Sequence, residues 1–196
     1  MRRRSGVDWM SDLRGARVGA VLAVAAAVGF LVWILFIHDS GNESTSQASK
    51  SHGAKSQGPV AASPEDLAAA ADTAGHPVYW AGPQDNTTLE LTITKDGRSY
   101  VRYLPPGVDV ADPQPKYLTI GTYPFKHAYD ALKAQSQKPG EVIEHTSDGG
   151  LVISSPSAPT SVYIAYRDQD VQVEVYDPNP HRALSLATSG DVQPAG

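Results

Sequence analysis

The sequence predicts an α+β protein with a single N-terminal transmembrane helix and a small domain, whose mainly antiparallel sheet has about seven or eight strands and three short helices. Three observations predict this fold. An uncharged apolar run of helical length stands near the N-terminus, β-rich runs follow one another across tight-turn residues, and helix-capping patterns stand between them. Because strands joined by tight turns are antiparallel, we expect the helices to cover the apolar face of one sheet.

The apolar run covers residues 18–37, which include no charged residue. At about 1.5 Å per residue, a helix of this length spans about 30 Å, the thickness of a bilayer's hydrocarbon core. Five arginines precede the run, and the first basic residue after it is Lys50. The positive-inside rule therefore predicts a single-pass protein of the cell membrane, with residues 1–17 in the cytoplasm and the C-terminal domain outside it.

A cleaved signal peptide is the alternative to this signal anchor. The apolar run is longer than the roughly 7 to 15 residues of a signal peptide's apolar region, and no small-x-small cleavage site follows Ile37. Both features favour an anchor that stays in the bilayer. The Ala-rich anchor, the Arg-rich start and the absence of cysteine are typical of a bacterial cell-envelope protein.

The rest of the chain divides into a disordered linker over residues 38–62, an extracytoplasmic α+β domain over residues 63–190 and a disordered tail over residues 191–196. The linker is rich in Ser, Gly, Gln and Lys and has no apolar cluster. From residue 38 onward the chain has 11 basic and 19 acidic residues, a net charge of −8, which argues against nucleic acid as a partner. The absence of cysteine excludes disulfides, thiolate nucleophiles and Cys-ligated metal sites.

The domain begins with a helix. Ser63 is a capping residue before Pro64 at the first helical position, and Gly75 ends the helix. A short strand over residues 78–80 follows. Residues 89–104 then predict a hairpin with a three-residue loop and Gly97 left-handed, which pairs Leu91 with Val101, Leu89 with Tyr103 and Glu90 with Arg102.

Residues 105–115 contain four prolines and predict a loop longer than usual. A strand over residues 116–122 follows it. We expect a helix to begin at Pro124, with Phe125, Ala128, Tyr129 and Leu132 on its apolar face and His127 on its polar face.

Two more hairpins and a last helix complete the domain. The first hairpin turns at residues 147–150. The second has a four-residue loop at residues 167–170, which pairs Ile164 with Val173 and Val162 with Val175. Asn179 and Pro180 then cap a final helix that ends near Gly190.

The sequence contains none of the specific catalytic signatures, neither a zinc-protease HExxH nor a GxSxG, a P-loop, a GxGxxG or an EF-hand loop. This absence favours a non-catalytic binding module of the envelope, with no cofactor and no metal. The alternative is an anchored envelope hydrolase or transferase in which carboxylates converge with one of the four domain histidines: His76, His127, His145 or His181. No residue is assigned a catalytic role.

Aromatic and charged residues suggest where such a module binds. All nine tyrosines follow residue 62, and several fall on strand faces that point away from the predicted core. The two aspartates of the long loop offer oxygens, although their spacing matches no calcium-ligand pattern. The candidate binding residues are Tyr100, Arg102, Asp109, Asp112, Tyr163 and Tyr176. The expected partners are the bilayer at residues 18–37 and an envelope protein or wall polymer at these residues.

Overall fold

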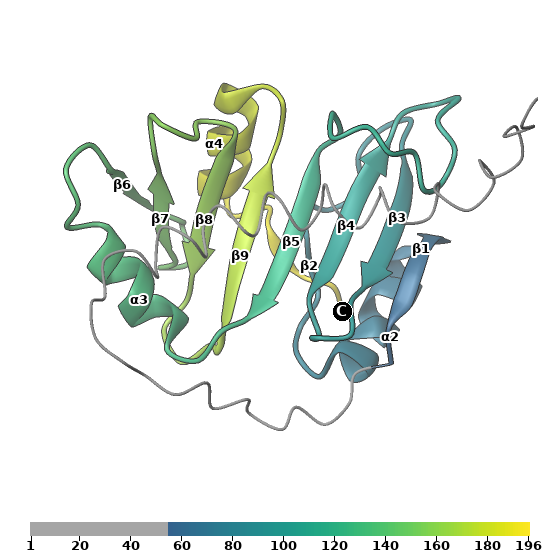
Figure 1. The fold of residues 1–196 in the computed structure, drawn as a ribbon, viewed down its shortest axis with the longest axis horizontal. Helices are drawn as coiled ribbons and strands as arrows, with labels where there is room; N and C mark the ends of the chain where they lie inside the picture. Colours follow the sequence, from purple (N-terminus) through teal and green to yellow (C-terminus); the bar gives the residue numbers. More distant parts are fainter. Residues whose placement is uncertain (1–54) are drawn as a thin grey trace, which may run out of the picture. The chain divides into compact units, whose positions relative to one another are not determined.

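The computed structural model describes residues 55–196, and Figure 1 shows how they fold. Eight antiparallel strands form one sheet in the order β1-β3-β4-β5-β9-β8-β7-β6. These strands are β1 (Gln57–Ala62), β3 (Thr88–Ile93), β4 (Ser99–Leu104), β5 (Thr119–Pro124), β6 (Val142–His145), β7 (Leu151–Ser154), β8 (Ser161–Ala165) and β9 (Val171–Tyr176). A two-stranded sheet pairs β2 (Tyr79–Trp80) with β10 (Gln193–Pro194). The prediction of a mainly antiparallel sheet with three helices is confirmed for this part of the chain.

The predicted transmembrane helix over residues 18–37, the basic segment before it and the linker up to residue 54 lie outside the described residues. Within residues 55–196, no helix has both the length and the apolar character needed to cross a bilayer.

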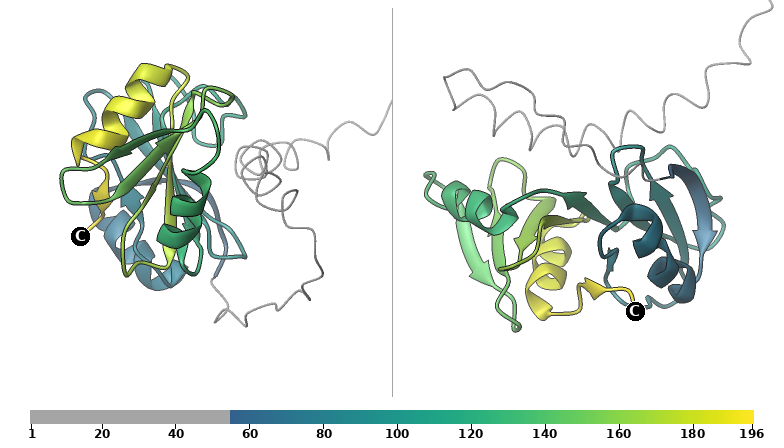
Figure 2. Two further views of the ribbon diagram at one scale, coloured as in Figure 1. Left: turned by 90° about the vertical axis from the view of Figure 1, so that its left-hand side faces the viewer. Right: turned by 90° about the horizontal axis from the view of Figure 1, so that it is seen from below.

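The helices lie on both faces of the large sheet. Figure 2 shows α2 (Pro64–Ala74) and α4 (Pro180–Ser189) on one face and α3 (Ala128–Gln135) on the other. The main core lies on the α2 and α4 side, and its fully buried members include Leu67, Val101, Ile120, Val173 and Ala187. A second, smaller core lies under α3 and consists of Ala128, Leu132, Leu151, Ile153 and Ala165.

The registers predicted for the β3–β4 and β8–β9 hairpins are confirmed. In the β3–β4 hairpin Leu91 pairs with Val101 and Glu90 with Arg102, and Gly97 has a φ of +82°, which residues with a Cβ rarely adopt. In the β8–β9 hairpin Ile164 pairs with Val173. In each case alternation of apolar and polar residues selected the register, because a slip by one residue would turn the apolar side chains away from the core.

The first helix is capped as its sequence predicts. The Asp66 N–H donates to Ser63 Oγ at 3.2 Å, and the Ser63 N–H donates to the Asp66 carboxylate at 2.8 Å. These reciprocal bonds satisfy main-chain donors that a helix start otherwise leaves without partners. Gly75 then ends α2 in the left-handed conformation, with a φ of +77°.

The strand predicted over residues 116–122 and the helix after it are displaced toward the C-terminus. Pairing with β9 extends β5 through Pro124, which lies opposite Val171, and the Phe125 N–H donates to Asp170 O at 2.8 Å. His127 then has a left-handed φ of +58°, and α3 begins at Ala128. The predicted helix start at Pro124 is therefore wrong, and Phe125 and His127 precede the helix.

Two segments predicted to be disordered take part in the fold. Residues 57–62, at the end of the predicted linker, form β1 and pair with β3. In the predicted tail, β10 pairs with β2, the Ala195 N–H donates to Val78 O at 2.8 Å, and Val192 is only 1% exposed. Both segments gain main-chain partners that are distant in sequence, and for this reason local composition did not reveal them.

Candidate functional site on the polar sheet face

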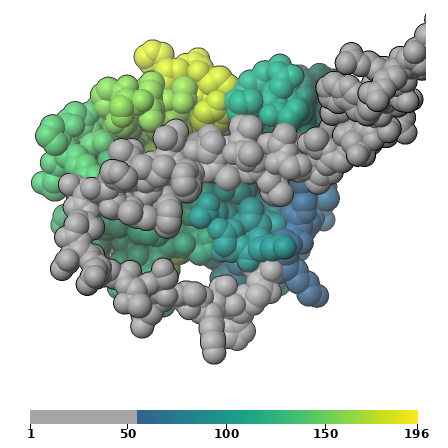
Figure 3. All heavy atoms as spheres, in the orientation of Figure 1, coloured from purple at the N-terminus to yellow at the C-terminus, as the bar shows by residue number. Residues whose placement is uncertain are grey.

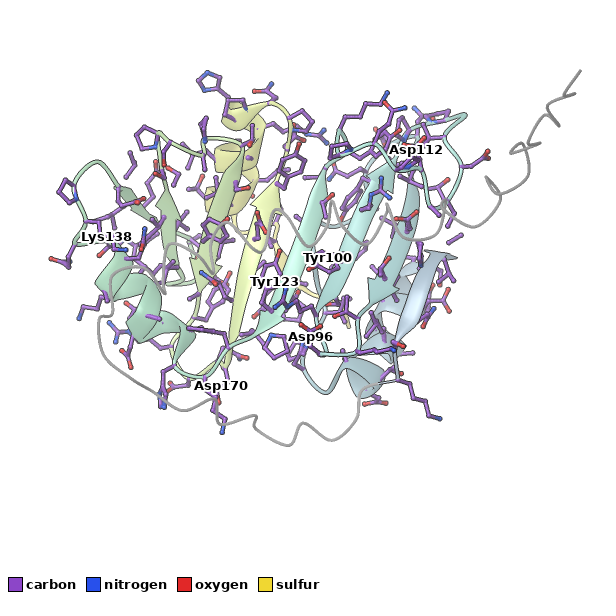
Figure 4. The ribbon with its side chains drawn as sticks, in the orientation of Figure 1. Asp96, Tyr100, Asp112, Tyr123, Lys138 and Asp170 are labelled. Carbon is purple, nitrogen blue, oxygen red and sulfur yellow. The ribbon has the colours of Figure 1, made fainter. Side chains whose placement is uncertain are left out.

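The side of the large sheet opposite α2 and α4 has a polar centre. On the four adjacent strands β4, β5, β9 and β8, residues that are paired with one another direct their side chains to the same side of the sheet. We define the tyrosine face by these residues: Tyr100, Arg102, Thr119, Tyr123, Ser161, Tyr163, Gln172, Glu174 and Tyr176. Figure 4 labels Tyr100 and Tyr123, which lie near each other on β4 and β5. Among the described helices, α3 lies on this side of the sheet, where it contacts β7, β8 and β9.

A buried carboxylate lies at the centre of the tyrosine face. Glu174 is only 2% exposed, and its Oε2 accepts a hydrogen bond from the Tyr123 hydroxyl. Its Oε1 accepts from the Tyr163 hydroxyl at 3.3 Å. The Tyr100 ring meets the Tyr123 ring edge-on, with centroids 5.9 Å apart and an interplanar angle of 78°. We call Glu174, Tyr123, Tyr163 and Tyr100 the carboxylate–phenol cluster.

Burial controls protonation within this cluster. It raises the pKa of Glu174 above the ordinary range of a carboxyl, although hydrogen bonds from Tyr123, Ser161 and Tyr163 oppose the rise. Burial, together with the nearby Glu174 charge, also raises the pKa of Tyr123 and of Tyr163. The phenols therefore remain protonated at neutral pH and keep their capacity to donate hydrogen bonds.

A second polar group fastens the long loop to the sheet. Arg102 Nη1 lies 2.7 Å from Glu90 Oε1, and Glu90 is 1% exposed. Arg102 Nη2 donates to the main-chain oxygens of Asp112 at 2.9 Å and Gln114 at 3.2 Å. The Ala111 N–H donates to the other Glu90 oxygen at 2.5 Å. Because both side chains of the ion pair also bind loop main chain, the pair holds the loop in one conformation.

Four of the six predicted binding residues separate into two sets. Tyr100 and Tyr163 belong to the carboxylate–phenol cluster. Arg102 and Tyr176 fasten the loop, since the Tyr176 hydroxyl donates to Pro115 O at 2.5 Å.

The two loop aspartates have different surroundings. Asp112, labelled in Figure 4, uses its main-chain oxygen for Arg102 and its Oδ1 for the Gln114 N–H. Asp109 is exposed, and its main-chain oxygen accepts from the Asp112 N–H at 3.2 Å. The structure thus assigns local loop-forming bonds to both residues.

The two central members of the cluster, Glu174 and Tyr123, are not among the predicted binding residues. The hairpin register places Glu174 opposite Tyr163, so the sequence contained a signal for this pair. Tyr123 enters the cluster only because β5 pairs with β9, and it lies beyond the end of the predicted strand over residues 116–122. No local pattern predicts that pairing.

The four histidines within residues 55–196 do not gather around a carboxylate. The His76 ring nitrogens lie 2.7 Å from Pro77 O and 2.5 Å from Gly97 O, which are main-chain oxygens. His127, His145 and His181 are exposed. Among residues 55–196, no histidine ring forms a hydrogen bond or ion pair with a carboxylate, and no group of three or more His, Cys, Asp and Glu side chains is arranged to hold a metal ion.

A scan against protein-family models, a search of curated proteins and a search of solved structures each found no match to this chain.

Proposed function

We propose that this chain is a membrane-anchored extracytoplasmic protein whose domain is a non-catalytic binding module of the cell envelope. The carboxylate–phenol cluster is the observation that carries the proposal. The half-buried rings of Tyr123 and Tyr163 offer flat amphipathic surface on one sheet face, and the buried Glu174 carboxylate holds their hydroxyls in place. These groups suit contact with an envelope protein or a wall polymer.

The bonding state of the domain's other polar groups supports binding over catalysis. The ion pair of Arg102 with Glu90 is engaged with the loop main chain, and no described histidine ring is paired with a carboxylate. No observation therefore favours the alternative of an anchored hydrolase or transferase. The tyrosine face is the surface that we assign to the ligand.

Site-specific photo-crosslinking in cells tests the binding face. A photoreactive phenylalanine analogue replaces Thr92, which lies beside Tyr100 in the β3–β4 pair, and the matched control replaces Thr188 on α4. We expect the Thr92 probe to capture an envelope protein or glycan, and capture to fall when Tyr100→Ala is added. Equal capture from both positions, or none from Thr92, would contradict the proposal.

The membrane topology has a separate test. Because the chain has no cysteine, Ser56→Cys and Ser11→Cys each introduce a single thiol. A membrane-impermeant maleimide added to intact cells should label the first and leave the second unlabelled. N-terminal sequencing of the mature protein distinguishes the anchor from a cleaved signal peptide, since cleavage would produce a chain that begins after residue 37.

A further inference from the structure

Strand β6 forms one edge of the large sheet and exposes apolar side chains there. Its Val142 is 44% exposed and its Ile143 is 47% exposed, the two largest values among the exposed large hydrophobic residues of the described chain. In the described residues, β7 is the only strand that pairs with β6. In Figure 3 the green residues that include β6 lie at the opposite end of the molecule from the blue residues of β1, which forms the other edge.

The two edges differ in how they resist pairing with another strand. Strand β1 contains Gly58 and Pro59, and its register with β3 shifts between Gln57 and Val60. A proline and an irregular register are features by which natural proteins protect sheet edges. Strand β6 contains no proline, no lysine and no register shift. Although β6 has only four residues and contains Glu144, it is thus the more open of the two edges to strand addition.

The hydrogen-bond phase of β6 follows from its hairpin. The Thr146 N–H donates to Gly150 O at 2.9 Å, and this pair continues the register of the β6–β7 ladder. Bonded pairs alternate with non-bonded pairs in antiparallel strands, so Glu144 and Val142 bond to β7. The main-chain groups of Ile143 and His145 therefore point away from β7, toward the open edge.

This edge is complementary to itself. If two copies of β6 pair antiparallel about a two-fold axis at Ile143, the two Ile143 residues exchange a pair of main-chain hydrogen bonds. The same register places His145 opposite Glu141 of the second copy on each side of the Ile143 pair, and within each chain the Glu141 carboxylate accepts from Gln135 Nε2 at 2.9 Å. On the other sheet face, Val142 lies against the aliphatic part of Glu144 from the second copy.

We propose that two copies of this chain associate through their β6 strands, in the register that centres on Ile143. The second copy is the occupant that fits, because in that register the exposed Ile143 packs against its own counterpart and the exposed Val142 packs against the aliphatic part of Glu144. The interface joins the two large sheets into one continuous sheet. The interface involves neither the tyrosine face nor its ligand, so this proposal can be tested independently of the proposed function.

A disulfide trap in the full-length chain tests the register. Paired residues of a bonded antiparallel pair have Cα atoms about 5.5 Å apart, within the range of about 4.4 to 6.8 Å that a disulfide spans. Since the chain has no cysteine, Ile143→Cys provides the only thiol, and Val60→Cys on the opposite edge is the matched control. Under mild oxidation in the membrane, we expect Ile143→Cys to form a dimer several times more abundantly than Val60→Cys.

Glu144→Cys controls for register, because this residue lies opposite Val142 of the second copy and should crosslink far less than Ile143→Cys. Sedimentation of the detergent-solubilised, cysteine-free chain provides a measurement without a trap. We expect a dimer that becomes a monomer in Ile143→Lys. A monomeric unsubstituted chain, equal crosslinking at Ile143 and Val60, or crosslinking of Ile143→Cys to a different protein would each overturn the proposal.

Discussion

Tyr163 of β8 lies directly across from Glu174 of β9, and its hydroxyl is 3.3 Å from the Glu174 carboxylate. One short hairpin therefore supplies both a buried acid and one of its two phenol donors. The other donor, Tyr123, comes from β5 on the opposite side of β9. The properties of the cluster thus depend on a local pair and on a distant one.

Removing a phenol donor should raise the pKa of Glu174 further. Of the hydrogen bonds that lower this pKa, the one from Tyr123 has the largest effect and the one from Tyr163 a smaller effect. We therefore expect Tyr123→Phe to raise the pKa more than Tyr163→Phe does. NMR titration of the Glu174 side-chain carboxyl measures both shifts. A larger shift in Tyr163→Phe, or no shift in either variant, would contradict the bonding described here.

Glu174 should make the stability of the domain depend on pH. Because its pKa is raised in the folded state, its contribution to stability is fully present below the unfolded pKa of about 4.3 and is lost as pH rises through the folded pKa. Each unit of elevation corresponds to about 1.4 kcal/mol. Urea unfolding of the wild type and Glu174→Gln across this pH range should show the wild type losing free energy of unfolding relative to the variant. If the free energy of unfolding of the wild type, relative to that of the variant, stayed constant or increased with pH, the raised pKa of Glu174 would be refuted.

The ion pair that fastens the long loop should be costly to break. Arg102→Met leaves Glu90 buried without its charge partner, and we expect a loss of about 3 kcal/mol in the free energy of unfolding. Amide exchange at Ala111, which donates to Glu90, should also become faster. Arg98→Met is the matched control, because Arg98 pairs with the half-exposed Asp96 and should cost less than about 1 kcal/mol.

Neutralising both members of that pair distinguishes the stability cost of an unpaired buried charge from the loss of the contacts that hold the loop. The double variant Glu90→Gln with Arg102→Met removes the unpaired buried charge, so it should recover much of the lost stability. Exchange at Ala111 should remain fast, because the loop has still lost its guanidinium contacts. If the double variant lost as much free energy of unfolding as Arg102→Met, the buried charge would not be the cause of that loss.

The C-terminal residues should contribute to stability although their composition predicts a frayed tail. Val192 is 1% exposed in the main core, so Val192→Ala should cost about 2 kcal/mol through lost burial and a residual cavity. Asp191→Ala changes the exposed neighbouring residue and should have little effect. Chemical denaturation measures both, and equal stabilities would mean that the tail does not pack as described.

The sequence predicts those parts of the fold that local rules govern. The register of the β8–β9 hairpin follows from apolar alternation across a short loop, and the start of α2 follows from the capping pattern at Ser63. It also places Tyr163 and Tyr100 on the face that holds the cluster. In these cases the residues that interact lie within one hairpin or one helical turn.

Pairing between strands that are distant in the sequence is the part of the fold that local patterns do not predict. Nothing in residues 57–62 indicates that they will bond to β3, and the extension of β5 to Pro124 depends on β9. Main-chain hydrogen bonds between distant strands carry no side-chain signature, so the sequence alone does not predict these partners. The central position of Glu174 and the inclusion of Tyr123 follow from the same distant pairing.

The β5–β9 pairing joins the first four strands of the large sheet to the last four, and it closes a long stretch of chain between Thr119 and Tyr176. Contacts of such sequence separation form late and slowly during folding. Since Tyr123 and Glu174 lie on opposite sides of this seam, the carboxylate–phenol cluster exists only after the seam has closed. A ligand bound at that cluster would contact both halves of the sheet. It would therefore bind the folded domain and not a partly folded chain.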